Sequence, residues 1–279
     1  MQTLDGHDGT RLACHRTGAG EPLICLPGGP MQASAYLGDL GGLSGHRALV
    51  LLDLRGTGDS EVPREAATYR CDRQVADVEA LRVELALDRI DLLAHSAGAS
   101  LALLYAARYP ERIGHLVLVN PSPRALAVDI SDADRRELAE LRRAEPWFPA
   151  AWAAFERIWS GGPTAADWSA ITPFSYGRWD HVTQAHAALA DQQRNGEAAA
   201  IYYGPGAIDP VALRSELAAV PFPTLVVAGE YDVALPPRRA AGLAAVFPDA
   251  ELLVQPRAGH YPWLDDPDLF VQQLVGRLS

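Results

Sequence analysis

Lysine is absent from this sequence of 279 residues, so all 24 of its basic residues are arginines. This absence excludes the phosphate-binding lysine of P-loop proteins, a lysine Schiff base and a lysine general base. Basic residues are also in the minority, because 35 acidic residues leave a net charge of −11. We therefore expect neither nucleic acid nor an anionic membrane as a partner.

Cysteine is scarce as well, with only Cys14, Cys25 and Cys71. An odd number of widely spaced cysteines fits neither a disulfide framework nor a CxxC metal site. His181 and His186 lie five residues apart, whereas the two histidines of a helical HExxH motif lie four apart. The sequence therefore predicts no metal site, and no motif in it calls for a cofactor.

Long apolar runs are missing too. No stretch reaches the roughly 18 apolar residues of a membrane-spanning helix, and the N-terminus MQTLDGHDGT lacks the segments of a signal peptide. We expect a cytoplasmic protein with no membrane partner, and the oligomeric state is left open. At 48% hydrophobic residues, the chain can still bury a substantial core.

Short apolar runs alternate with helical patterns along most of the chain. The runs at 23–26, 48–52, 90–94, 115–119, 224–228 and 252–254 indicate buried strands. Residues 33–43, 69–87, 99–108, 178–194 and 267–278 are typical of helices, and residues 2–16 of a β-hairpin. This alternation predicts an α/β fold, a mostly parallel sheet with helices on both faces. Ligands of such sheets bind at the C-terminal ends of the strands.

The strand pattern stops between residues 122 and 222. This stretch has helical patterns and contains Trp147, Trp152, Trp159, Trp168 and Trp179, five of the six tryptophans. A helical insertion of this length between two strands predicts a cap over an active site. The chain then divides into a core of residues 1–121 and 223–279 and a cap of residues 122–222. The tryptophans line a pocket or, more simply, pack the cap.

Ser96 lies in the sharp turn between the strand expected at 90–94 and the helix expected at 99–108. The segment AHSAG at 94–98 matches the nucleophile elbow G-x-S-x-G, with Ala94 in place of the first glycine. Small residues on either side of the nucleophile leave room for the strand and helix that cross there. An ordinary serine at a helix N-cap is the simpler alternative.

Asp232 and His260 each follow a predicted strand, and the chain order Ser–Asp–His is that of the α/β-hydrolases. His260 would take the proton of Ser96, while Asp232 would hold the imidazole in the required tautomer. Any one of these residues could be structural. Together, each in the expected context, they predict a catalytic triad.

Gly28 and Gly29 directly follow the strand expected at 23–26. Their backbone N–H groups, together with that of Ala97, are predicted to form an oxyanion hole, although a plain tight turn is the alternative. The later segment DLRGTGDS at 53–60 has only two glycines and is not a dinucleotide-binding fingerprint. We expect Asp53 and Arg55 to form a structural hydrogen-bonding cluster.

These motifs resemble the α/β-hydrolase superfamily over nearly the whole chain, and within it the proline iminopeptidase branch (peptidase family S33). LPGGPM at 26–31 is similar to the HGGPG segment of that branch, DLRGTGDS to its DQRGxGxS segment, and AWAAFE at 151–156 to its AWxxWE segment. GEYDVALP at 229–236 and AGHYPWLDDP at 258–267 match the acid and base loops of the superfamily. The resemblance implies a hydrolase that forms an acyl-enzyme beneath a helical cap. It also implies that Glu156 binds the free α-amino group of a substrate.

Two departures from that branch bear on the substrate. Ala97 stands where the branch commonly has tryptophan, and no second cap glutamate precedes Ile201-Tyr202-Tyr203. The resemblance favours a serine hydrolase that removes an N-terminal, proline-like aminoacyl group from a small peptide or amide. The alternative is an esterase, lactonase or thioesterase for a small metabolite, with an apolar pocket and no buried acid. A third hypothesis is a ligand-binding protein on a hydrolase scaffold, which only turnover excludes. In every case the partner is a small molecule or a short peptide.

Overall fold

The computed structural model describes residues 1–278, and its eight strands form one sheet in the order β1-β2-β4-β3-β5-β6-β7-β8. The strands are β1 (Gln2–Asp5), β2 (Arg11–Thr17), β3 (Pro22–Leu26), β4 (Ala48–Leu52), β5 (Ile90–His95), β6 (Ile113–Val119), β7 (Thr224–Gly229) and β8 (Ala250–Gln255). β2 pairs antiparallel with β1 and β4, and all other pairs are parallel. The predicted hairpin and mostly parallel sheet are confirmed.

Helices cover both faces of this sheet. One hydrophobic cluster joins it to α1 (Cys71–Glu84), α2 (Gly98–Arg108), α9 (Pro210–Leu217) and α10 (Pro237–Ala244). A second cluster joins the other face to α11 (Pro262–Asp265), α12 (Pro267–Val275) and two 3-10 turns, η1 (Ser34–Leu37) and η2 (Leu43–Gly45). Neighbouring residues of β3 point into opposite clusters, Ile24 into the first and Cys25 into the second. Burial on both faces explains why the strands read as continuous apolar runs.

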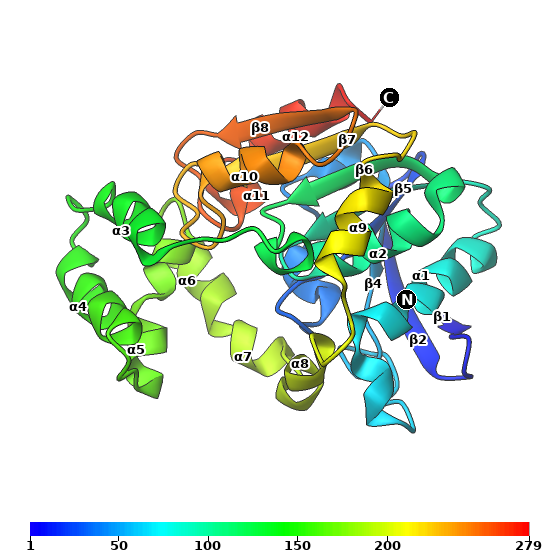
Figure 1. The fold of residues 1–279 in the computed structure, drawn as a ribbon, viewed down its shortest axis with the longest axis horizontal. Coiled ribbons are helices and arrows are strands. Elements are labelled where there is room, and N and C mark those ends of the chain that lie inside the picture. The colour runs from blue at the N-terminus through cyan, green and yellow to red at the C-terminus, as the bar shows by residue number, and fades with distance from the viewer. Residues whose placement is uncertain (279) are drawn as a thin grey trace.

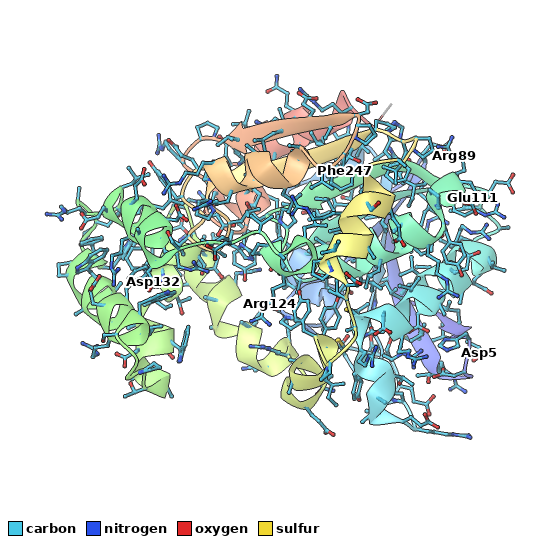
Figure 2. The ribbon with its side chains drawn as sticks, in the orientation of Figure 1. Asp5, Arg89, Glu111, Arg124, Asp132 and Phe247 are labelled. Carbon is cyan, nitrogen blue, oxygen red and sulfur yellow. The ribbon has the colours of Figure 1, made fainter. Side chains whose placement is uncertain are left out.

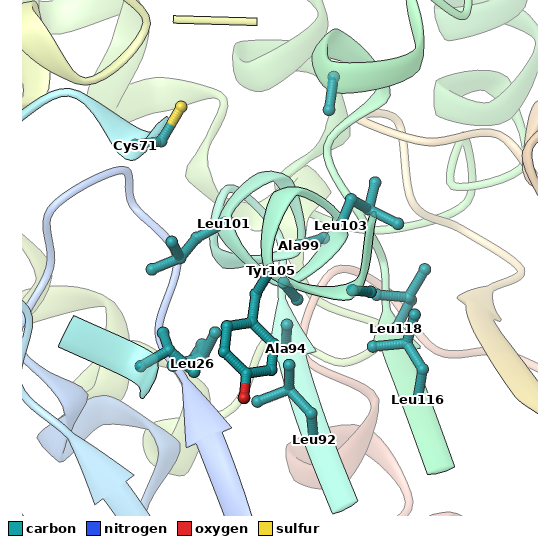
Figure 3. Close-up of a cluster of buried hydrophobic side chains, with 14 of the residues drawn as sticks. Leu26, Cys71, Leu92, Ala94, Ala99, Leu101, Leu103, Tyr105, Leu116 and Leu118 are labelled. Atoms are coloured by element: carbon teal, nitrogen blue, oxygen red, sulfur yellow. The ribbon is translucent and has the colours of Figure 1, made fainter. Parts of the chain in front are cut away.

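α2 is the helix that lies across the middle of the sheet. Figure 3 shows Ala99 and Tyr105 of α2 close to Leu92 and Ala94 of β5, with the apolar side chains of neighbouring strands around them. Fully burying one such leucine stabilises the fold by about 1.5–3 kcal/mol. This packing fixes the direction of the helix that begins directly after residue 97.

Residues 122–222 contribute no strand to the sheet in the part of the chain that the structure describes. They form η5 (Pro123–Leu126), α3 (Asp132–Glu140), α4 (Phe148–Trp159), α5 (Ala165–Ala170), η6 (Thr172–Ser175), α6 (His181–Ala188), α7 (Ala190–Gln193), α8 (Gly196–Tyr202) and α9. Figure 1 shows α3, α4 and α5 as a lobe at the left, from which α6, α7 and α8 lead back to the core. In Figure 2, Asp132 lies in this lobe, whereas Arg89 and Glu111, which precede β5 and β6, lie at the opposite end. The lobe is therefore on the side where the parallel strands end.

The lobe has a small apolar core of its own. Phe148, Phe155 and Phe174 form its centre, and Trp147, Trp152 and Trp159 pack around them. Packing, the simpler of the two predictions, therefore accounts for these tryptophans. α9 packs instead on α2, within the helical layer over the sheet. The division of the chain at residues 121 and 222 stays a prediction.

Two predicted helices differ in the structure. The helix expected at 33–43 is wrong: η1 and η2 stand there, separated by Gly38, Gly41 and Gly42 with positive φ angles that an α-helix does not allow. The helix expected at 178–194 is divided into α6 and α7, and Asp180 caps the start of α6. Among residues 1–278, no helix combines the length and the apolar character needed to span a membrane.

Candidate active site

Ser96 occupies a strained turn between β5 and α2. Its φ angle of 52° lies in the left-handed region, which costs a residue with a side chain roughly 1–3 kcal/mol. Two residues later, Gly98 has no room for a side chain, because a Cβ atom there would lie 2.4 Å from the Pro27 carbonyl oxygen. Ala94, which replaces the first glycine of the motif, is fully buried. The small residues therefore do what the sequence predicts: they allow the turn to close.

The imidazole of His260 lies between Ser96 and Asp232. Its Nδ1 is 2.8 Å from Asp232 Oδ2 and its Nε2 is 2.9 Å from Ser96 Oγ. Because a carboxylate only accepts, Nδ1 carries the proton, and Nε2 of the neutral ring accepts from the serine hydroxyl. Asp232 is fully buried, whereas Ser96 and His260 are partly exposed. The structure thus brings together three residues that are far apart in the sequence.

Asn120, at the end of β6, connects the strand before Asp232 to the loop that carries His260. Its Oδ1 accepts from the Gly229 N–H at 2.8 Å, and its Nδ2 donates to the Gly259 carbonyl at 3.0 Å. Sequence reasoning missed this residue. The available signal was a polar residue directly after a buried strand, at the edge where ligands bind.

The His260 loop also rests against the end of η6. The His260 N–H donates to the Ser175 carbonyl at 2.7 Å, and the Gly259 N–H donates to Asp265 Oδ2 at 2.7 Å. Gly259 permits this approach, since a Cβ atom there would lie 2.6 Å from the Ser175 oxygen. Burial raises the pKa of the Asp265 carboxyl, although it accepts backbone N–H bonds. The position of His260 therefore depends on a segment from outside the sheet.

Of the three predicted oxyanion donors, the structure leaves two without a protein acceptor. The Gly28 N–H donates to the Tyr36 hydroxyl at 2.7 Å and is not free. Within residues 1–278, neither the Gly29 nor the Ala97 N–H donates to another residue. A Cβ atom on Gly28 would lie 2.7 Å from Ser96 Cβ, so this loop packs directly on the elbow. The predicted oxyanion hole is therefore narrowed to two candidate donors, the N–H groups of Gly29 and Ala97, and stays a prediction.

His95, directly before Ser96, is a further buried group that sequence reasoning missed. Its Nδ1 is 2.7 Å from the Tyr36 hydroxyl, and its Nε2 is 2.9 Å from the His260 carbonyl oxygen. Burial holds the pKa of the His95 imidazole well below its usual range, and burial raises the pKa of Tyr36 well above its usual range. Both side chains are therefore neutral near pH 7.

Glu156 is not brought to the triad. It belongs to α4, at the outer left of Figure 1, and its carboxylate pairs with Arg136 of α3 at 2.8 Å. The two side chains are 42% and 39% exposed, respectively. The carboxylate is thus already paired, and the predicted role in binding a substrate amine has no support from this arrangement.

The expected cluster around Asp53 and Arg55 exists as two separate groups. Asp53 accepts from Ser34 and from the Asp59 N–H, while the fully buried Arg55 pairs with Asp77 and Asp8. In the described residues, His15, Asp53 and Asp59 have donor atoms close enough to share a metal ion. Asp53 already accepts hydrogen bonds from N–H and O–H groups. These hydrogen bonds are sufficient to explain why the three side chains lie close together.

Comparison with known proteins finds relatives that align with nearly the whole of this chain. Residues 21–267 match the family model described as alpha/beta hydrolase fold. A proline iminopeptidase of Heyndrickxia coagulans is 24% identical over 91% of this chain and 89% of its own. The crystal structure of a proline iminopeptidase of Mycobacterium smegmatis has a TM-score of 0.75 and 25% identity, and covers 99% of this chain and 97% of that one. An esterase structure from Exiguobacterium antarcticum has a TM-score of 0.74 at 19% identity, covering 99% and 98%, which shows a shared fold.

Proposed function

The chain belongs to the alpha/beta hydrolase fold family and is an enzyme of that type, and from this premise we propose that it is a serine hydrolase with Ser96 as its nucleophile. The observation that carries the proposal is the His260 ring, which lies within hydrogen-bond distance of both Ser96 and Asp232. Nucleophile, base and orienting acid are then in contact before any substrate binds.

In the proposed reaction the substrate carbonyl binds between Ser96 and the N–H groups of Gly29 and Ala97. His260 takes the Ser96 proton as Oγ attacks the carbonyl carbon, and Asp232 stabilises the imidazolium. Collapse of the tetrahedral intermediate breaks the bond to the leaving group, which receives the proton from His260. Water, activated by the same histidine, then hydrolyses the acyl-enzyme and restores the serine.

We propose an uncharged carboxylic ester of a small molecule as the substrate class, which includes lactones and thioesters. The ion pair between Glu156 and Arg136 supports this choice, because it engages the carboxylate that an aminopeptidase would need for the substrate's ammonium group. Release of an N-terminal aminoacyl group is the second candidate. It is favoured by the similarity to proline iminopeptidases along nearly the whole chain.

The test compares p-nitrophenyl acetate and butyrate with proline and alanine p-nitroanilides, using the unmodified enzyme and Ser96→Ala. We expect ester turnover that falls at least roughly 1,000-fold in the variant, since its nucleophile is gone. Ser44→Ala is the matched control, because Ser44 lies in η2, before β4, at the edge of the sheet where that strand begins. Faster Ser96-dependent turnover of the anilides would favour the second candidate. Turnover that survives in Ser96→Ala, or its absence with both substrate sets, would refute the proposal.

A further inference from the structure

Tyr36 and His95 connect two loops that the proposed reaction uses. Tyr36 lies in η1, after the loop of Gly28 and Gly29, and its hydroxyl contacts both the Gly28 N–H and His95 Nδ1, each at 2.7 Å. The other nitrogen of His95 reaches the backbone carbonyl of His260 at 2.9 Å. Tyr36 is 5% exposed and His95 is 1% exposed, so water does not compete for these bonds.

The donor and the acceptor of each of these three hydrogen bonds can be assigned without ambiguity. The His260 carbonyl only accepts, so His95 Nε2 carries the proton of the neutral ring. His95 Nδ1 is then an acceptor, and the Tyr36 O–H donates to it. The Tyr36 oxygen in turn accepts from the Gly28 N–H. Each of these hydrogen bonds therefore has one donor and one acceptor. Their directions cannot reverse while His95 stays neutral.

The cap contacts the same tyrosine. His186 of α6 lies 3.2 Å from the Tyr36 carbonyl through Nε2, while its Nδ1 lies 2.8 Å from the Tyr176 hydroxyl. The carbonyl again fixes the direction, since it requires a proton on His186 Nε2. Tyr36 is thus held on its backbone by the cap and on its side chain by the residue beside the nucleophile.

We propose that Tyr36 and His95 are positioning residues that set the distance between the Gly28–Gly29 loop and the His260 loop across Ser96. The inference rests on the proposed function. Neither side chain forms a hydrogen bond with Ser96 Oγ or with the His260 ring nitrogens, although the His95 and His260 rings pack together with their centroids 4.7 Å apart. Tyr36 acts through the Gly28 N–H, one peptide before the peptide that carries the Gly29 N–H, and His95 acts through the backbone carbonyl of His260. Small displacements matter here, because an error of about 1 Å in the reacting geometry costs up to roughly 100-fold in rate.

The first experiment is Tyr36→Phe, which removes one oxygen atom and keeps the ring. We expect kcat for the ester to fall about tenfold with KM within about twofold, because the loss affects the transition state more than substrate binding. Affinity for an alkyl boronic acid, which forms a tetrahedral adduct on Ser96, should also fall about tenfold. Tyr105→Phe is the matched control, since its buried hydroxyl bonds to Glu79 between α1 and α2. It should leave both values unchanged.

The two ends of the connection can be tested separately at His95. Asn offers an acceptor near the place of Nδ1, so His95→Asn should keep the Tyr36 bond and lose the bond to the His260 carbonyl. Gln reaches the place of Nε2, so His95→Gln should do the opposite. We expect His95→Gln to weaken boronate binding as Tyr36→Phe does. His95→Asn should instead lower kcat with boronate affinity within about threefold.

The outcomes are read per folded molecule, with thermal melting measured for each variant. Variants with a lower melting temperature but an unchanged kcat would show that Tyr36 and His95 contribute only to packing. That result would overturn the inference. Equal defects of His95→Asn and His95→Gln in both readouts would overturn it too. If the unmodified enzyme shows no turnover that depends on Ser96, the proposed function fails, and the inference fails with it.

Discussion

The edge of the sheet around Ser96 and the lobe of α3, α4 and α5 are held together in different ways. At the sheet edge, buried polar groups from distant parts of the chain bond to one another, as Asn120 does with Gly229 and Gly259. In the lobe, the ion pair of Arg136 and Glu156 is partly exposed and joins neighbouring helices, while aromatic rings form the centre. Buried bonds between distant segments fix positions closely. Exposed ion pairs fix them weakly.

This contrast explains why the two regions differ in what the sequence reveals about function. The turn at Ser96 has a positive φ angle and needs small residues beside it, so its motif is recognisable in the sequence. A residue on an exposed helix face tolerates many replacements, so similarity there is weak evidence for a role. The structure accordingly brings together the predicted triad and leaves Glu156 in a surface pair.

The largest effect is expected for Asp232→Asn. The amide would keep the shape of the side chain and the bond from the Ala234 N–H, but it would present N–H to His260 Nδ1. The imidazole would then hold its proton on Nε2 and could not accept one from Ser96. We expect kcat to fall roughly 10,000-fold with folding retained, measured by ester turnover and circular dichroism. Activity within tenfold of the unmodified enzyme would exclude Asp232 as the orienting acid.

A smaller but substantial effect is expected for Gly28→Ala. The new Cβ atom would lie 2.7 Å from Ser96 Cβ and 2.8 Å from the His95 carbonyl oxygen, so the loop must move. Because Gly29 follows directly, we expect kcat to fall about 100-fold. Gly45→Ala is the control, since no atom lies within 4 Å of a Cβ atom built there and its φ angle is ordinary. Equal activity of the two variants would argue against Gly29 as an oxyanion donor.

Mild acid should destabilise the structure around His95 and His186 before it affects the lobe. Burial lowers the pKa of His95 and of His186 below their ordinary value of about 6.5. The unfolded chain then binds protons that the folded chain does not, so the free energy of unfolding falls as pH drops below about 6.5. The loss is at most about 1.4 kcal/mol per pH unit for each histidine.

In the lobe, the bond from Arg157 holds the pKa of Asp167 at about 2, so this pair keeps its charge in that range. Thermal melting between pH 7.5 and 5.5 measures the effect, and His186→Gln should make the curve flatter. A melting temperature that does not change across this range would contradict the assignment of neutral buried histidines.

The smallest effect is expected for Glu156→Gln. Its carboxylate is partly exposed and paired with Arg136, so the loss of its charge should change ester turnover by less than about twofold. The same variant separates the two substrate classes. If the enzyme hydrolyses amino-acid anilides, a loss of tenfold or more with those substrates alone would restore Glu156 as an amine-binding residue. KM and kcat on both substrate sets are the measurements.

Much of the fold followed from local patterns in the sequence. Strands β3 to β7 are continuous apolar runs because both faces of the sheet are covered, and each was expected within a few residues. The failures have local causes: glycines with positive φ break the helix expected at 33–43, and the one expected at 178–194 is interrupted at Leu189, whose N–H donates to the His186 carbonyl three residues before it. Neither conformation is evident from the apolar pattern alone.

The site could be predicted only in part. Ser96, Asp232 and His260 follow recognisable strands, so their meeting at one edge follows from topology. The bond between Gly28 and Tyr36 did not follow, because it depends on the unexpected turn η1. Asn120 and His95 were missed for a similar reason. Their partners lie 59 to 165 residues away, and no spacing in the sequence encodes such a pairing.

The bond from the His260 N–H to the Ser175 carbonyl has a consequence for protein engineering. A graft that exchanged residues 122–222 for those of another enzyme would replace the acceptor that holds the histidine's own backbone. The same exchange would remove the close contact of Gly259 with the Ser175 backbone. It would also remove the hydrogen bond from the Arg178 N–H to the Asp265 carboxylate. Residues 122–222 therefore cannot be exchanged as an independent unit. A working chimera would keep residues 172–178 as a native stem and vary only α3, α4 and α5.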